Sequence, residues 1–168
     1  MMIVAKFLFI NLPKNIFEII NKLFHQFFDK KEAKFQSILV ALSGKTNDIK
    51  SISIAKNLIE KKSGVITFVH VLEIDLDKPI DIELPEKTSS GDKILSNILK
   101  KHQIQTYNHK SVLLQARNAG PAIISEASNQ STEVIIISKK NEQNRSSLSK
   151  TIKYVLENSQ CSVLLIQE

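Results

Sequence analysis

Hydroxyl and basic side chains cluster between residues 138 and 151, directly after an apolar run of β-branched residues. Such side chains bind phosphate, most readily beside the N-terminus of a helix. A phosphate loop also needs glycine, so that the backbone can approach the ligand, and this chain has no glycine after Gly120. The stretch therefore indicates either a divergent anion site or a polar surface loop with an ordinary helix cap. Its hydroxyl and basic residues are Ser138, Lys139, Lys140, Arg145, Ser146, Ser147, Ser149, Lys150 and Thr151.

A second segment, Ser43-Gly44-Lys45-Thr46, has the form of the end of a P-loop and follows a predicted strand. The full P-loop pattern, G-x-x-x-x-G-K-[ST], would also place a glycine at Leu39, which lies inside that strand. We therefore interpret the segment as an ordinary turn.

The other reactive side chains form no catalytic or metal-binding pattern. An acidic loop lacks the glycine turn and the closing acid of a calcium site, and the histidines lack partners at zinc spacing. The single cysteine has no evident catalytic partner. We predict no catalytic residue, no metal and no cofactor, with ATP as the one alternative. The residues considered are Asp75, Asp77, Asp81, Glu83, His70, His102, His109 and Cys161.

The amino-acid composition limits the kinds of partner and the cellular compartment that we expect for this protein. The 168-residue chain is 42% hydrophobic and carries a net charge of +6, which suits one domain with an extension. Its lysines are spread along the sequence and no basic-aromatic platform accompanies them, so nucleic acid is not an expected partner. One cysteine excludes an internal disulfide and fits a reducing compartment, which favours a cytoplasmic location.

Residues 1–34 are predicted to be an extension that contains an amphipathic helix over 14–29. Its apolar positions fall on one half of the helix and its polar positions on the other. This apolar face can pack on the same domain or a second subunit, lie in a membrane interface, or bind another protein. Charged and polar residues interrupt the segment, so it is neither a signal peptide nor a bilayer span. The apolar residues are Ile16, Phe17, Ile19, Ile20, Leu23, Phe24, Phe27 and Phe28.

Residues 35–168 alternate apolar strands with helices. This alternation predicts an α/β domain with right-handed crossovers and a parallel sheet that helices cover on both faces. A ligand would lie at the switch point, beside the loops after the first and fourth strands. In the first helix, Ile49 and Ile52 are expected to face inward, and Asn47 or Asp48 to cap the N-terminus. Strands are expected at 37–42, 65–72, 110–114, 134–138 and 162–167, and helices at about 48–61, 89–102, 118–129 and 149–158.

Three segments of the core carry recognisable motifs: ILVAL with the turn after it (38–44), GVITFVHVLE (64–73) and KTIKYVLENSQCSVLLI (150–166). These motifs resemble those of the universal stress protein (UspA-like) family, and the likeness covers about 35–168. Two further segments, DIELPE (81–86) and QARNAGPAIISEA (115–127), are similar to a subgroup of these domains that is often linked to membrane transporters.

The resemblance implies a Rossmann-like, five-stranded parallel sheet of order 3-2-1-4-5. It also implies a homodimer through the last strand, at Val163, Leu164, Leu165 and Ile166. One branch of the family binds ATP through an aspartate after the first strand and a loop of the form G-x2-G-x9-G-[ST]. Here Ser43 stands at the aspartate, Ser138 and Ser149 stand at glycines, and Lys150 stands at the hydroxyl residue.

We therefore expect a homodimeric regulatory or adaptor module that lacks the usual ATP-binding glycine loop. The alternative is an adenine-nucleotide-binding stress protein with a divergent phosphate loop. In that case a degenerate nucleotide or anion site would comprise Ser43, Val71, Ser138, Lys139, Ser149, Lys150 and Thr151. The helix at 14–29 would add a protein or membrane-surface partner, and with it a peripheral membrane association.

Overall fold

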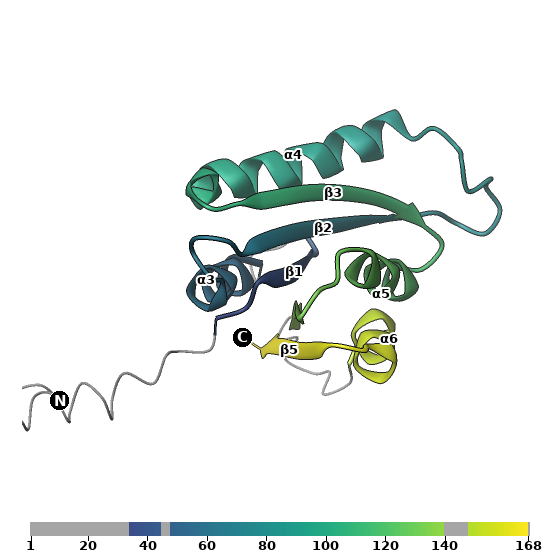
Figure 1. Ribbon diagram of the computed structural model, residues 1–168. Helices are drawn as coiled ribbons and strands as arrows, with labels where there is room; N and C mark the ends of the chain where they lie inside the picture. The colour runs from purple at the N-terminus through teal and green to yellow at the C-terminus, as the bar shows by residue number, and fades with distance from the viewer. Residues whose placement is uncertain (1–33, 45–47, 140–147, 168) are drawn as a thin grey trace, which may run out of the picture. The chain divides into compact units, whose positions relative to one another are not determined.

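Five strands form one parallel sheet in the order β3-β2-β1-β4-β5 (Figure 1). The computed structural model describes residues 34–44, 48–139 and 148–167, so the predicted helix at 14–29 lies outside the described residues. The predicted fold class and strand order are confirmed. The strands are β1 (Ser37–Leu42), β2 (Val65–Glu73), β3 (His109–Ala116), β4 (Val134–Lys139) and β5 (Ser162–Gln167).

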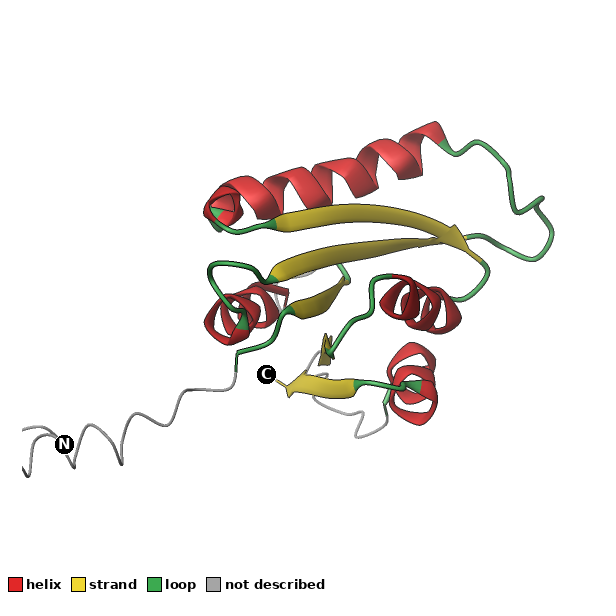
Figure 2. Ribbon diagram, viewed as in Figure 1, coloured by secondary structure: helices red, strands yellow, loops and turns green. Residues whose placement is uncertain are grey.

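Of the helices that the structure describes, two cover each face of the sheet (Figure 2). On one face, α3 (Asp48–Leu58) and α4 (Pro85–Lys101) pack on alternate residues of the strands. On the other face, α5 (Ala119–Asn129) and α6 (Lys150–Asn158) pack on the intervening residues. Because successive strand residues point to opposite faces, the unbroken apolar run 134–137 is buried on both.

Helix α3 is rotated and shorter than predicted. Ile49 was expected to face inward, yet it is 40% exposed, because Asp48 turns inward in its place. The helix ends at Leu58 and not near residue 61, because Ile59 leaves the helix to form a parallel bridge with Phe35. That bridge also ties the start of the described chain to the domain.

Helix α4 begins four residues earlier than predicted. The sequence predicted that this helix starts near Ser89, after an acidic loop. Pro85 instead occupies the first turn of α4, where its fixed φ suits a helix and its missing N–H costs no hydrogen bond. A short 3-10 turn, η1 (Ile104–Thr106), then leads into β3.

The turn after β1 depends on glycine. Gly44 has a φ of +78°, and a Cβ built there would lie 2.7 Å from Cδ1 of Ile94 in α4. The left-handed backbone favours glycine, and a larger residue would also require the end of the Ile94 side chain to move. Gly44 therefore sets the direction of the backbone just after the carboxyl end of β1.

Within the part of the chain that the structure describes, none of the helices combines the length and the apolar character needed to cross a lipid bilayer.

Candidate functional site

The carboxyl ends of β1 and β4 meet at a buried carboxylate. Asp48, at the start of α3, is only 1% exposed. Its Oδ1 accepts hydrogen bonds from the Ser43 backbone N–H (3.2 Å) and the Ser43 hydroxyl (3.1 Å), and its Oδ2 accepts one from the Gly44 N–H (2.7 Å). The Ser138 hydroxyl, at the end of β4, lies 3.4 Å from Oδ1. One side chain thus joins the turn after β1, the start of α3 and the end of β4.

This arrangement brings together two of the predicted site residues, Ser43 and Ser138, and gives both hydroxyls the same partner. Lys139 is the last residue of β4 and is half-buried. The segment after it, which includes Lys140 and Arg145, lies outside the described residues. Backbone amides at a strand-to-helix turn can bind an anion, but here the Ser43 and Gly44 amides already bind the carboxylate of Asp48.

The N-terminus of α6 carries three other predicted site residues. Ser149 is its N-cap, and its hydroxyl accepts a hydrogen bond from the Ile152 N–H at 3.3 Å. This is the ordinary cap that satisfies one of the free amides of a helix. Lys150 and Thr151 follow in the first turn and line a cavity of about 700 Å³.

That cavity lies where the N-termini of α5 and α6 face the chain leaving β2 and β3. Its walls carry both acidic and basic side chains. Helix N-termini favour anions, but the Glu73 carboxylate already accepts a hydrogen bond from the Ala119 N–H of α5 at 2.8 Å. Arg117 is likewise engaged, because its guanidinium donates to the carbonyls of Asp75 and Lys78. The charged residues of the wall are Glu73, Asp75, Arg117 and Lys150.

Val71, the remaining predicted site residue, lies within β2 opposite Leu114 of β3 and packs on the core beneath α5. The neighbouring His70 forms a hydrogen bond that connects two strands, because its Nδ1 lies 2.9 Å from the Leu42 carbonyl oxygen. A carbonyl oxygen can only accept, so Nδ1 carries the proton and ties the end of β2 to the end of β1.

Histidine 102 ends α4 on the same face as α3. Burial lowers the pKa of His102 below its usual value, and the neighbouring Lys101 and Lys56 lower it further. The imidazole of His102 is therefore neutral near pH 7. The backbone carbonyl of His102 accepts a hydrogen bond from the Lys56 ammonium at 2.9 Å.

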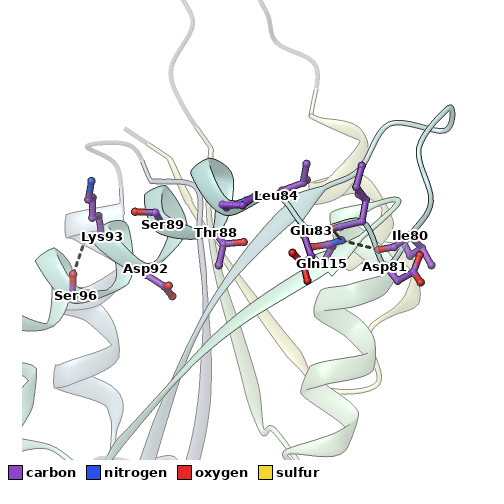
Figure 3. Close-up of a pocket in the computed structure, with 12 residues that line it drawn as sticks. Ile80, Asp81, Glu83, Leu84, Thr88, Ser89, Asp92, Lys93, Ser96 and Gln115 are labelled. Carbon is purple, nitrogen blue, oxygen red and sulfur yellow. Dashed lines mark hydrogen bonds between the residues drawn. The ribbon is translucent and has the colours of Figure 1, made fainter.

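A second cavity, of about 880 Å³, lies between α4 and the end of β3 (Figure 3). The amide of Gln115 donates to the carbonyls of Ile80 (2.7 Å) and Ile82 (2.8 Å) and so holds the acidic loop beside β3. The carboxylates that line it are Asp81, Glu83 and Asp92. Nowhere among the described residues do three His, Cys, Asp or Glu side chains gather closely enough to hold a metal ion.

Sequence reasoning missed the two carboxylates that organise this edge of the sheet. Asp48 was considered only as a cap of its own helix, and Glu73 was not considered as a site residue. The signal for Asp48 was its position in the first turn of a helix that follows a strand and a glycine turn. Nothing in the sequence alone pairs Glu73 with Ala119, because the two residues meet only through the β2–β3 register.

The fold and this site define an open, Rossmann-like α/β domain whose switch point lies between β1 and β4. Residues 34–167 match the model of the universal stress protein family. The chain belongs to the universal stress protein family.

Solved structures share the fold. A universal stress protein from Archaeoglobus fulgidus is 16% identical, with a TM-score of 0.62 over 79% of this chain and 94% of its own. UspA from Lactobacillus plantarum is 17% identical, with a TM-score of 0.60 over 80% and 99%. A complex of an A. fulgidus universal stress protein with dAMP is 14% identical, with a TM-score of 0.58 over 78% and 97%. No match is found among curated proteins.

Replacing Asp48 tests its role in the fold. We predict that Asp48→Asn lowers the free energy of unfolding by about 1–3 kcal/mol, because a charged acceptor is lost and an amide N–H₂ is placed against backbone donors. Urea denaturation measures this change as a lower midpoint at an unchanged slope. Asp77→Asn, in the exposed acidic loop, is the matched control and should change stability by less than about 0.5 kcal/mol. Equal stability of both variants would contradict the role of Asp48.

Proposed function

We propose that the chain acts as a regulatory or adaptor module of the universal stress type that does not hold ATP through the glycine loop of the ATP-binding branch. The observation that supports this is the occupation of the amide donors at the carboxyl edge of the sheet. Asp48 takes those of Ser43 and Gly44, and Glu73 takes that of Ala119. A phosphate placed there would displace these acceptors and meet their negative charge.

A second candidate, an adenine-nucleotide-binding protein, is favoured by one other observation. Lys150 and Thr151 line the cavity at the N-termini of α5 and α6, where the helix dipoles favour an anion. The similar A. fulgidus protein is a complex with dAMP. In this alternative the nucleotide would use lysine and hydroxyl groups in place of glycine amides.

Nucleotide-dependent thermal stability separates the two candidates. We predict that millimolar ATP, ADP or AMP, each with magnesium, leaves the unfolding midpoint unchanged. A nucleotide at 100 times its Kd would instead stabilise the fold by about 2.7 kcal/mol, and the midpoint would rise by several degrees.

A rise in the midpoint that disappears in the variant Lys150→Ala would establish the second candidate in place of the first. Lys153→Ala is the matched control, because Lys153 also lies on α6 but does not line the cavity.

The family resemblance also supports a homodimer through β5. This strand lies at one edge of the sheet, and its Val163, Leu164 and Leu165 are only half-buried in the single chain. An apolar edge strand needs cover, and pairing with a second copy supplies it. The buried Ile166 would then anchor the strand from within its own domain.

We predict that light scattering gives the full chain twice its 19.0 kDa mass and that Leu164→Glu reduces this to the single-chain mass. The charge would be buried in the interface, which is costly. Ile80→Glu is the control, because Ile80 is 47% exposed beside β3 at the opposite edge. Circular dichroism checks that both variants fold. A single-chain mass for the unmodified protein would contradict the dimer.

The predicted helix at 14–29 is proposed to bind a membrane surface or a partner protein, in keeping with the likeness to transporter-linked domains. If its phenylalanine face enters a membrane interface, the full chain should float with anionic liposomes. The double variant Phe24→Glu/Phe27→Glu should not float.

The double variant His25→Glu/Gln26→Glu adds similar charge on the polar face and should still float. Identical behaviour of the two double variants would exclude membrane insertion of the apolar face and would leave a protein partner.

A further inference from the structure

Strand β3 is an edge strand of the sheet, so one side of its backbone faces no other described strand. At its two ends, the carbonyls of Asn108 and Ala116 accept hydrogen bonds from the N–H groups of Ile66 (3.0 Å) and Ile74 (2.9 Å). A parallel strand turns alternate residues toward the same neighbour, so the even-numbered residues between these two also face β2. The N–H and C=O groups of residues 111, 113 and 115 are therefore directed at the open edge.

No other segment among the described residues pairs with these outward backbone groups. The loop before α4 lies beside the end of β3, but the Gln115 side chain holds it there, through the carbonyls of Ile80 and Ile82. The backbone of β3 takes no part in those hydrogen bonds. An edge strand with unpaired N–H and C=O groups is a template on which another extended segment can pair.

The cavity of about 880 Å³ described above runs along this edge, and we call it the β3 groove (Figure 3). Its walls are Gln115, the loop 80–84 and one flank of α4 between Thr88 and Ser96. Gly91 of α4 packs on Leu113, because a Cβ built there would lie 2.6 Å from Cδ1 of Leu113. The groove therefore follows β3 over residues 111–115, a length of about 13 Å at 3.3 Å per residue, which suits about five residues of an added strand.

The charge of the β3 groove favours a basic occupant, although the whole chain has a net charge of +6. Its described wall carries the carboxylates of Asp81, Glu83 and Asp92 against the single ammonium of Lys93. These carboxylates are exposed, and none of them forms a hydrogen bond or an ion pair with another described residue. A second copy of the chain paired here would bring like charges together, which disfavours self-association at this edge.

We propose that the β3 groove binds a basic peptide segment in an extended conformation, which pairs with the backbone of Ser111 and Leu113 as a sixth strand. Its lysine or arginine side chains lie on the α4 side, beside Glu83 and Asp92. The backbone hydrogen bonds supply affinity and the carboxylates supply selectivity. The groove lies at the edge opposite β5 and contains no residue of the predicted nucleotide site, so the proposal depends neither on the dimer nor on nucleotide binding.

Fluorescence anisotropy of a labelled peptide tests the proposal with the full chain. The probe is fluorescein-Lys-Val-Lys-Val-Lys-Val-Lys-amide, and we expect its anisotropy to rise saturably as protein is added. A first control peptide carries a methyl group on every backbone amide, which keeps the charge but prevents strand pairing. A second control has glutamate in place of lysine. Neither control should bind. No saturable rise with the probe, or equal affinity of either control peptide, would overturn the proposal.

The variant Ser111→Pro tests the pairing with β3. It removes an N–H that faces the open edge and leaves the hydrogen bonds to β2 in place, and proline is tolerated on edge strands in this orientation. We expect the probe to bind about tenfold more weakly or worse. Ser111→Ala keeps the N–H and is the matched control, with unchanged affinity. Thermal unfolding checks that both variants fold, and full affinity in a folded Ser111→Pro would contradict strand pairing.

The double variant Glu83→Gln/Asp92→Asn tests the charge of the groove and leaves the backbone of β3 unaltered. We expect it to weaken probe binding about fivefold at low ionic strength, and less as salt is added. Asp77→Asn/Glu157→Gln is the matched control, because it removes the same charge from exposed residues outside the groove. An equal loss of affinity in the two double variants would contradict the assignment to the groove.

Discussion

The hydrogen bonds that Asp48 accepts hold together the carboxyl edge of the sheet. A buried carboxylate is stable only when several donors surround it, and the turn after β1 and the end of β4 supply them. The turn can do so because the consecutive N–H groups of Ser43 and Gly44 both point at this carboxylate. The Asp48 side chain therefore connects β1, α3 and β4. Because it occupies the hydrogen-bond donors of this edge, it also limits what the edge can bind.

At the two neighbouring helices, acceptors from the chain itself likewise bind the free N-terminal amides. Glu73 accepts from the first amide of α5, and the Ser149 hydroxyl accepts from an amide of α6. In open α/β domains these helix N-termini and the switch point are the usual places for an anionic ligand. In this chain its own oxygen atoms bind the donors, which is why we favour a module that acts through its surfaces over one that acts through a bound nucleotide.

The sheet was predictable from the sequence because each strand is a short apolar run bounded by polar residues. The run at 134–137, for example, has no polar residue that could face solvent, so it predicts a strand buried on both faces of the sheet. The orientation of α3 was not predictable in this way. Its apolar periodicity placed Ile49 inward, but the hydrogen bonds of Asp48 outweigh the burial of one isoleucine. The start of α4 was missed because an acidic, proline-containing segment is typical of a loop, although Pro85 also suits a first helical turn.

The candidate site was predictable only in part. The sequence placed Ser43 and Ser138 at the ends of neighbouring strands, and they do meet there. Both hydroxyls donate to the carboxylate of Asp48. This contact was not predictable, because it depends on a side chain that turns back from the start of the next helix. The pairing of Glu73 with Ala119 is likewise a tertiary contact without a local pattern.

The most direct test is a titration of the isotope-labelled full chain with magnesium ATP, followed through the backbone amide resonances of Ser43, Gly44, Ala119 and Ile152. These amides are the donors that the chain's own acceptors occupy. We predict that their chemical shifts stay unchanged up to millimolar nucleotide. Saturable shifts at these amides would show that phosphate displaces Asp48, Glu73 or Ser149, and would contradict the proposal that this edge of the sheet does not bind nucleotides.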